Sequence, residues 1–587
     1  MTEGLEVTAP AGAENAGSDI RDEMFTLESW GWSANPDECA PKILALESLM
    51  NLAPPQAVAS VSYQSRGNVL VVAGSEAPRA RAAAARLVTH LQVTLLLPEG
   101  AAASDPYPTW TGQVEKLAGY LGEFTASIAG LRAPGQLASA QPVPAKFDLV
   151  LDFSRVPLFG MRQPPQGYFI APSDEGALEA VLAELRESVG EFDKPRFFTY
   201  RENICAHSRS AVEGCSACIE ICSTQAISPA GDKVKVDPHL CMGCGACATV
   251  CPSGAMGYQY PRVADRGAQM KQLLTTYRVA LGTGPCIVFH NGTDGRELLA
   301  AAAASGSGLP ANALPLEAWH VASTGLDLLL PAIAFGATSV AVLSAGSEDA
   351  QYLAALRHQM AIGQAILRQL GYAGTHFTVI EASTPGQLTA AFEALAPAAA
   401  PAVPASFMLG NDKRTAIEFA VDHLLKHAPS PVDEIALPEG SLFGQVLVDQ
   451  AKCTMCMACV GACPESALMD GVDKPLIKFL ERNCVQCGLC EATCPEGAIS
   501  LSARLLLTPA VREARVLNET QPFHCVRCSK PFGTRQMVDA MMGRLMGHSM
   551  FAQGDAIKRL QMCADCRVVD MMSATNEVSV LRLGNDS

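Results

Sequence analysis

The sequence has little charge. Asp, Glu, Lys and Arg make up 17% of its 587 residues, against about 25% in an average soluble protein. The charge present is unbalanced, because 59 acidic and 43 basic residues give a formal net charge of −16. An acidic surface repels phosphate backbones, which argues against nucleic acid as a partner. The apolar share of 49% is ample for buried cores, and the length indicates about four domains.

A secretory signal and a clear membrane span are also missing. The first 23 residues, MTEGLEVTAPAGAENAGSDIRDE, are acidic and contain no basic stretch followed by an apolar run. The stretch 328–345 is uncharged, but Pro331 and Gly336 interrupt it. A short helix followed by a buried strand has the same hydropathy as a membrane span. We therefore expect a cytoplasmic protein that does not itself span a membrane.

Signatures of nucleotide binding and catalysis are absent as well. The pair Gly282-x-Gly284 precedes a predicted strand instead of following one, and the turn within 67–80 lacks a GxGxxG pattern. The sequence contains no P-loop, and its His, Ser and carboxylate residues assemble into no catalytic set. We expect the chain alone to have no catalytic activity.

Two stretches alternate predicted strands with predicted helices, which is typical of parallel α/β layers. In 61–195 the strands are at 67–74, 93–100 and 147–154, and the helices at 80–91 and 175–189. In 263–396 the strands are at 285–292, 339–346 and 376–382, and the clearest helix is at 351–372. A Pro/Ala-rich linker at 395–406 and a helix at 412–428 follow.

Cysteine is abundant, with 22 residues. Three runs share the spacing C-x2-C-x2-C-x3-C-P, and a fourth is a variant with nine residues in its first gap. Each run continues into a similar tail: CSTQAI, CPSGAM, CPESAL or CPEGAI. In an intracellular chain this spacing favours metal ligation over disulfides. The runs are Cys205, Cys215, Cys218, Cys222; Cys241, Cys244, Cys247, Cys251; Cys453, Cys456, Cys459, Cys463; and Cys484, Cys487, Cys490, Cys494.

These runs, within 201–260 and 446–502, resemble the bacterial two-cluster ferredoxins, whose thiolates hold iron–sulfur clusters. The resemblance implies four [4Fe-4S] clusters, with the last cysteine of each run starting a helix and binding the cluster of the other run in its pair. No three-iron cluster is expected. Zinc is the alternative, but zinc sites favour two separate C-x2-C pairs. The implied ligand sets are Cys205, Cys215, Cys218, Cys251; Cys241, Cys244, Cys247, Cys222; Cys453, Cys456, Cys459, Cys494; and Cys484, Cys487, Cys490, Cys463.

The variant run departs from the ferredoxin pattern at two points. Its first gap is long, and Ser223 stands where proline is usual. His207 lies two residues from Cys205 and is an alternative ligand to it.

Two further C-x2-C pairs lie near the C-terminus: Cys525 with Cys528, and Cys563 with Cys566. Two such knuckles make a closed, zinc-ribbon-like site of four cysteines, for which we predict zinc. Rubredoxin-like iron is the alternative, although rubredoxin knuckles usually carry Gly after the second cysteine, and Ser529 and Arg567 follow here.

The segment between these pairs predicts a helix at 534–548, with Thr534 as its cap. Methionine is dense in this region and either fills a core or forms an adaptable docking surface. The single cysteines Cys39 and Cys286 are predicted to be buried apolar residues, and Trp319 and His320 to pack within the second α/β layer.

The second α/β stretch also resembles a known family. Residues 313–349, the helix that follows and the segment from 376 are similar to the small iron–sulfur (delta) subunit of methyl-viologen-reducing hydrogenases. That family passes electrons to heterodisulfide reductase. Its two-iron cluster cysteines have no counterparts here, so the resemblance implies a retained fold without the cluster.

The leading hypothesis is an iron–sulfur electron-transfer protein that serves a partner oxidoreductase. Resemblance to large polyferredoxins implies a formate dehydrogenase as that partner. The alternatives are an assembly, maturation or redox-sensing factor, and a catalytic oxidoreductase subunit that uses an α/β pocket.

The expected fold is a multidomain combination of α/β and α+β parts, with two parallel α/β layers, two ferredoxin-like modules and a C-terminal four-cysteine region. The predicted parts are an N-terminal segment at 1–60, an α/β domain at 61–195, a 2x[4Fe-4S] module at 196–262, an α/β domain at 263–396, a linker and helix at 397–445, a second 2x[4Fe-4S] module at 446–505, and the four-cysteine region at 506–587.

Overall fold

The computed structural model describes residues 36–101, 105–161, 164–306, 308–472, 474–546, 548 and 554–573. The N-terminal stretch from which we expect no secretory signal lies outside these residues. The chain divides into two compact units. The first unit comprises residues 1–200, 217–230 and 234–429, and the second comprises 201–216, 231–233 and 430–587. Across the described ranges, no helix combines the length and the apolar character needed to cross a membrane.

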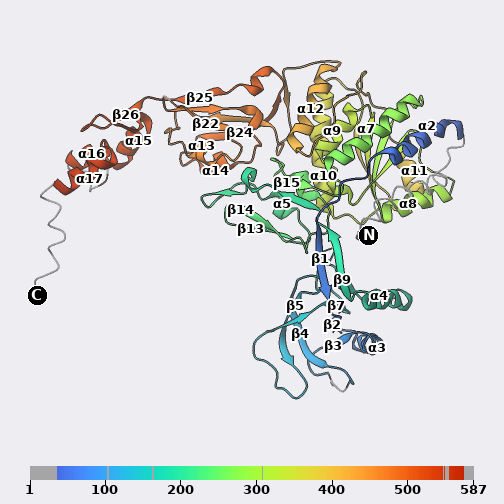
Figure 1. Cartoon of the computed structure of the whole chain (residues 1–587). Helices are drawn as coiled ribbons and strands as arrows, with labels where there is room; N and C mark the ends of the chain where they lie inside the picture. The colour runs from blue at the N-terminus through green and yellow to red at the C-terminus, as the bar shows by residue number, and fades with distance from the viewer. Residues whose placement is uncertain are drawn as a thin grey trace, which may run out of the picture. The chain divides into compact units, whose positions relative to one another are not determined.

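The first unit contains a seven-stranded sheet with the strand order β6-β5-β4-β3-β2-β7-β8 (Figure 1). The buried runs predicted as strands form its centre, and the predicted helices α3 (Ala77–Leu87) and α4 (Glu175–Glu187) pack on one face through their buried Ala and Leu residues. The strands are β2 (Asn68–Val72), β3 (Gln92–Leu97), β4 (Thr109–Ala118), β5 (Phe124–Arg132), β6 (Val143–Phe147), β7 (Leu149–Asp152) and β8 (Tyr168–Ile170).

The prediction of a purely parallel layer is wrong for part of this sheet. Strands β4, β3, β2, β7 and β8 run parallel to one another, but β5 pairs antiparallel with both β4 and β6. Strands β4 and β5 mix buried positions with intermediate or exposed ones, so they lack the continuous apolar run that marks a fully buried strand. The sheet is therefore mixed.

The chain enters and leaves this sheet through an antiparallel ribbon of β1 (Ser60–Ser65) and β9 (Gly190–Pro195) (Figure 1). Strand β10 (Phe198–Tyr200) then pairs with β15 (Met256–Tyr258) at the end of the first cysteine-rich segment. The elements between them are η2 (Glu202–Ile204), β11 (Ser208–Arg209), β12 (Val212–Glu213), α5 (Ala217–Glu220), β13 (Ile227–Ala230), β14 (Lys233–Val236) and α6 (Ala246–Val250).

A second sheet in the first unit is wholly parallel, as predicted, with the order β17-β16-β18-β19. All six residues of β16 are buried, which matches an inner strand of a parallel sheet. Its strands are β16 (Cys286–Asn291), β17 (Ala313–Ala318), β18 (Ser339–Ser344) and β19 (Phe377–Glu381), and its helices include α8 (Asp294–Ala304), α10 (Ala350–Gln369) and α11 (Pro385–Glu393).

Helix α9 (Leu326–Ala334) explains the uncharged stretch at 328–345. Every residue of α9 is buried, because helices α7 (Val263–Val279), α10 and α12 (Lys413–Lys426) pack around it. The chain then enters the buried strand β18, so the prediction of a short helix followed by a strand is confirmed. Helix α12 occupies the predicted place after the linker, and helix α2 (Pro36–Glu47) packs against α7.

The second unit holds the second cysteine-rich segment between two small antiparallel sheets, with orders β20-β24-β21 and β22-β23-β25. The short helices α13 (Ala458–Ala462) and α14 (Leu489–Thr493) carry two of the cysteine runs. The strands are β20 (Glu434–Ala436), β21 (Gly444–Val448), β22 (Leu468–Asp470), β23 (Leu476–Phe479), β24 (Ile499–Leu506) and β25 (Arg515–Glu519).

The C-terminal region consists of the hairpin β26 (Pro522–His524) and β27 (Pro531–Thr534), followed by α15 (Arg535–Leu545), α16 (Gly554–Leu560) and α17 (Ala564–Ser573). The predicted cap is confirmed, because the Thr534 hydroxyl accepts from the Met537 N–H at 3.2 Å. The same hydroxyl donates to the Thr454 carbonyl at 3.0 Å. The hairpin is thus attached to the second cysteine-rich segment.

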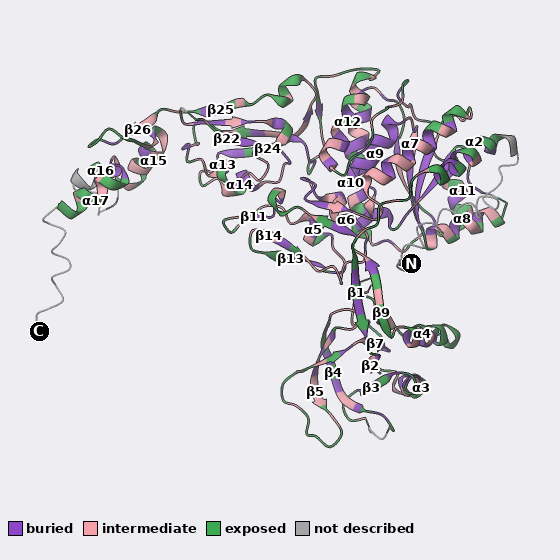
Figure 2. Ribbon diagram, viewed as in Figure 1, coloured by how far each residue is buried: buried purple, intermediate pink, exposed green. Residues whose placement is uncertain are grey.

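The methionines near the C-terminus divide between the two predicted roles. Met562 packs beside Cys525 and Cys563 in a small core, whereas Met546 and Met572 are exposed. Helix α17, which carries Met572, is largely exposed along its length (Figure 2). Met550 lies outside the described residues.

Candidate metal centres in the cysteine-rich segments

The three regular runs share one backbone conformation. In each run, the residue before the second cysteine and the residue after it have positive φ, in the left-handed region. Gly occupies only some of these positions, and Met455, Met457 and Gln486 hold the same conformation without being glycine. The repeated turn bends each run into a loop with its first three thiols on the inner side. The positions are Gly243 and Gly245; Met455 and Met457; and Gln486 and Gly488.

The tails are also alike in all four runs, including the variant one. Three residues after the last cysteine, Gln225, Gly254, Ser466 and Gly497 all have φ between 51° and 71°. Shortly after this turn, backbone N–H groups donate to the sulfur of the last cysteine: Ala467 to Cys463 at 3.2 Å, and Ala498 to Cys494 at 3.3 Å. The turn therefore presents the last thiol to N–H donors that favour a thiolate.

The expectation that the last cysteine starts a helix is wrong. Cys251, Cys463 and Cys494 follow the short helices α6, α13 and α14 and take extended backbone angles as their C-caps. Each helix instead contains the third cysteine of its run. The fourth thiol is turned away from the first three because the chain leaves the helix at that residue.

The second cysteine-rich segment brings thiols of different runs together. Cys453, Cys456 and Cys459 line one hollow with Cys494. Cys484, Cys487 and Cys490 line a second with Cys463. The last cysteine of each run thus lies beside the first three of the other run.

The electrostatics of these hollows match a cationic cofactor. Burial and the neighbouring charges of Cys453, Cys456 and Cys494 raise the pKa of Cys459 to about 12. Burial also raises the pKa of Cys487 to about 12. Four neighbouring thiols cannot all ionise next to one another without compensating positive charge, and binding of iron supplies that charge. The donor set therefore fits [4Fe-4S] clusters, which thiolates hold and which exchange one electron each.

In the first unit, Cys222 lies close to the run that starts at Cys241. Burial is the largest influence on the pKa of Cys247 and raises it well above its usual value, and the charges of Cys241, Cys244 and Cys222 raise it further. This places the last cysteine of the variant run beside the first three thiols of the next run. Cys218 and Cys251 are also buried in this unit.

Cys205 and Cys215 belong to the second unit, and Cys205 is buried there. The ring Nδ1 of His207 lies 3.1 Å from the Cys215 carbonyl oxygen, so in the neutral tautomer that donates this bond only Nε2 has a free lone pair. The choice between Cys205 and His207 as a ligand stays a prediction.

The structure gives Ser223, which stands in place of proline, a role that the spacing did not indicate. Its hydroxyl forms a short hydrogen bond with the hydroxyl of Tyr352 on α10. Burial raises the pKa of Cys244, and a hydrogen bond with Tyr352 opposes that rise. A serine here therefore links the second α/β part to a ligand thiol. Sequence analysis missed Tyr352, which belongs to no cysteine motif.

The prediction that Trp319 packs inside the second α/β layer is wrong. Its side chain is 52% exposed, and its indole N–H donates to the carbonyl of Met242, between Cys241 and Cys244, at 3.3 Å. His320 is buried, as predicted, with Nδ1 accepting from the Ala322 N–H. Cys39 and Cys286 are also buried, as predicted.

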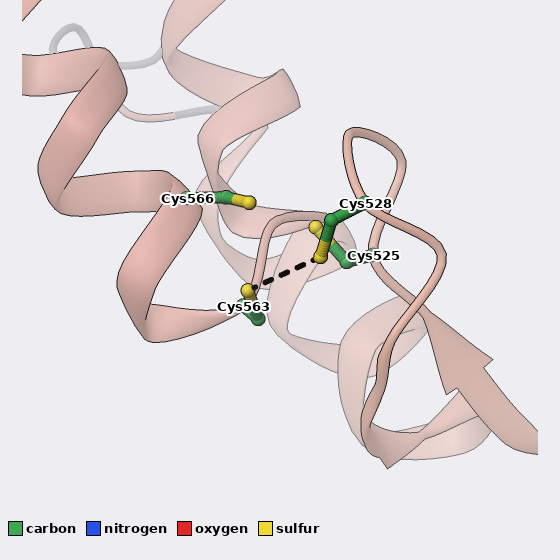
Figure 3. Close-up of side chains that lie close together, drawn as sticks. All are labelled: Cys525, Cys528, Cys563 and Cys566. Atoms are coloured by element: carbon green, nitrogen blue, oxygen red, sulfur yellow. Dashed lines mark hydrogen bonds between the residues drawn. The ribbon is translucent and has the colours of Figure 1, made fainter.

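The four C-terminal cysteines lie close together (Figure 3). The sulfur atoms of Cys525, Cys528, Cys563 and Cys566 all lie within 4.8 Å of one another, and those of Cys528 and Cys563 are 3.7 Å apart. Tetrahedral zinc with Zn–S bonds of about 2.3 Å needs sulfur atoms about 3.8 Å apart. The set therefore fits one tetrahedral ion.

The two C-x2-C pairs lie on different kinds of structure. Cys525 and Cys528 lie on the hairpin loop between β26 and β27, where Ser529 takes a left-handed φ of 59°. Cys563 directly precedes α17, and Cys566 lies in its first turn (Figure 3). Arg567 needs no special backbone conformation because it is helical. Burial opposes ionisation of Cys525, but N–H groups of Cys563, Cys528 and Arg527 outweigh it and lower its pKa to about 6.

Replacing Cys525 or Cys563 by Ser is expected to release the bound metal and loosen the C-terminal region. The free energy of zinc binding is about 10–16 kcal/mol in zinc-finger peptides, and it stabilises the folded state because the unfolded chain has no such site. Metal analysis and proteolysis of residues 506–587 measure the two effects. Ser529→Ala is the control, because it leaves all four thiols in place. Loss of the iron–sulfur absorption together with the C-terminal metal would contradict a separate site.

The comparisons with known proteins agree with this geometry. Residues 213–255 match a 4Fe-4S dicluster domain, and residues 452–499 match a second 4Fe-4S dicluster domain. Both cysteine-rich segments therefore match ferredoxin-like iron–sulfur domains.

Three relatives share local similarity with the chain. Hydrogenase-4 component A of Escherichia coli (strain K12) is 35% identical over 66 residues, which cover 11% of this chain and 30% of that protein. Ferredoxin 7Fe of Hydrogenibacillus schlegelii and a ferredoxin of Alicyclobacillus acidocaldarius subsp. acidocaldarius are 36% and 41% identical over 44 residues, which cover 8% of this chain and 56% of each ferredoxin. Each match spans less than two thirds of the relative.

Proposed function

We propose that the chain is an electron-transfer protein that carries four [4Fe-4S] clusters and relays electrons to or from a partner oxidoreductase. The main support for this proposal is that thiols of different runs group together. Cys494 lines the hollow of the Cys453 run, and Cys463 lines the hollow of the Cys484 run. Two-cluster ferredoxins use this arrangement to hold a pair of clusters close together.

A contact within the second unit supports electron exchange between the two modules. The hairpin of β11 and β12, between Cys205 and Cys215, packs against α14 of the second module. Gly214 lies directly on Leu489, because a Cβ at Gly214 would be 2.4 Å from the Leu489 Cγ. The charge of Cys215 also contributes to the raised pKa of Cys487, after burial and the nearer thiols. In this proposal, electrons pass between the modules from the Cys487 cluster to the Cys215 cluster.

The partner is proposed on two grounds. One relative is named as a component of hydrogenase-4, which favours assembly with a redox enzyme. The polyferredoxin resemblance points to a formate dehydrogenase. The resemblance of residues 313–349 to the hydrogenase delta subunit stays a prediction, and it favours the second α/β part as the docking element. We further propose zinc at the C-terminal four-cysteine site.

The test uses anaerobically purified, fully loaded protein. We expect it to accept electrons from a strong artificial reductant and to pass them to a dye or ferredoxin-like acceptor, but not to oxidise NADH or formate by itself. The rate of acceptor reduction is the measurement, and protein stripped of iron is the control. Reduction of the clusters by NADH alone, with flavoprotein contamination excluded, would instead favour a catalytic subunit. Clusters that reduce only at rates too slow for turnover would favour a sensing or maturation role.

A further inference from the structure

Two buried lysines from outside the cysteine runs reach the first ferredoxin-like module within the first unit. Lys194 lies on β9, at the exit of the seven-stranded sheet, and Lys413 begins α12 after the second sheet. Both side chains are buried. Each donates to the backbone carbonyl of a cysteine, Cys241 in one case and Cys251 in the other. Neither lysine is close in sequence to the cysteine that it contacts.

Lys413 makes three hydrogen bonds to the loop that ends the run of Cys241 to Cys251. Its Nζ donates to the carbonyl oxygens of Ala248, Thr249 and Cys251 at 2.9, 2.6 and 3.0 Å. These are the free carbonyls at the C-terminal end of α6, which no residue of that helix can satisfy. Three acceptors require three N–H donors, and only the charged ammonium form of lysine has three. The three acceptors therefore favour the charged form of Lys413, whereas burial opposes it by lowering the pKa of the ammonium group.

Lys194 makes a similar arrangement at the start of the run. Its Nζ donates to the carbonyl oxygens of His239 and Cys241 at 2.7 and 2.8 Å and lies 4.9 Å from the centre of the Tyr63 ring. The Tyr63 hydroxyl donates to the same His239 carbonyl at 2.7 Å. The ring of His239 stacks on Tyr120 at 4.5 Å. Side chains of the first α/β part thus contact the residues that directly precede Cys241.

Resting on the proposed electron-transfer function, we propose that Lys194 and Lys413 are positioning residues that hold the cysteine loops of the first module and raise the reduction potentials of its clusters. Adding an electron makes a cluster more negative, so a nearby fixed positive charge stabilises the reduced form. Buried charges are screened much less by solvent than exposed ones. A role in loop packing alone would affect stability and leave the potentials unchanged.

The test is a redox titration of the full-length, iron-loaded protein, followed by electron paramagnetic resonance. The Cys244→Ser variant identifies the signals of the first module, because the resonance signals that it loses belong to a first-module cluster. Lys194→Met and Lys413→Met are each expected to lower the reduced-to-oxidised ratio of a first-module cluster about tenfold at fixed potential. This corresponds to a reduction potential that is about 59 mV lower for a one-electron couple. Unchanged first-module potentials in iron-replete variants overturn the inference.

Two further variants keep the test decisive. Lys452→Met is the matched control, because Lys452 adjoins Cys453 but is exposed and paired with Asp449 at 3.3 Å, so no shift is expected. If Lys413→Met loses iron, Lys413→Gln is titrated instead, because it keeps amide N–H donors and removes the charge. An unchanged potential in that variant also overturns the inference. Failure of the wild-type protein to reduce reversibly would instead refute the proposed function itself.

Discussion

Replacing Cys463 by Ser is expected to damage the cluster of Cys484, Cys487 and Cys490 and to leave the cluster of its own run intact. Cys463 follows α13 as its C-cap, and there the chain turns its thiol toward the other run. Serine is a poor ligand for iron compared with a thiolate. The expected loss is one of two clusters in this module, or about four irons per chain.

The matched variant is Cys494→Ser, which is expected to remove the cluster of Cys453, Cys456 and Cys459 instead. Iron analysis gives the size of each loss, and the electron paramagnetic resonance signals of the two variants identify which cluster is missing. Identical spectra from the two variants, or loss of the Cys453 cluster in Cys463→Ser, would overturn the crossed assignment.

Gly214→Ala is expected to slow electron exchange between the two modules. The added Cβ would lie 2.4 Å from the Leu489 Cγ and 2.8 Å from the Ala206 carbonyl oxygen. Both distances are too short for non-bonded atoms, and Leu489 is fully buried, so the hairpin has to move away from α14. Such overpacking costs about 1–3 kcal/mol of stability, and it lengthens the distance between Cys215 and Cys487.

Gly461→Ala is the control for this variant, because nothing lies within 4 Å of a Cβ placed there and α13 tolerates alanine. Rapid-freeze spectroscopy after addition of less than one electron per chain follows the redistribution between modules. The thermal unfolding midpoint reports the packing cost. Exchange as fast in Gly214→Ala as in the control would show that electrons do not pass through this contact.

The iron–sulfur ligands could be predicted from the sequence. Binding one cluster fixes the number of residues between cysteines more strictly than folding alone does. The four similar tails, from CSTQAI to CPEGAI, correspond to four turns with positive φ at the same position. The buried strands β2, β3, β7, β16 and β18 were also predictable, since each is a short apolar run between turns. Helix α9 was separable from a membrane span because Pro331 and Gly336 interrupt the run.

The parts that were missed depend on contacts between distant segments. Strands β5 and β6 have no continuous apolar run, so only the pairing of β5 with β4 and of β6 with β5 identifies them. Lys194, Tyr352 and Lys413 belong to no motif, because their partners are backbone carbonyls and a thiol far away in the sequence. From the sequence, Ser223 is only a departure from the ferredoxin pattern, because its hydrogen-bond partner, the Tyr352 hydroxyl, lies far away in the chain.

The central claim is that this chain is an electron carrier with four one-electron centres. Coulometric titration of the anaerobically purified protein, with iron and sulfide measured on the same sample, tests it most directly. We expect reversible uptake of about four electrons per chain, with about sixteen irons and sixteen sulfides. Uptake of about two electrons with about eight irons, or reduction that cannot be reversed without loss of iron, would contradict the claim.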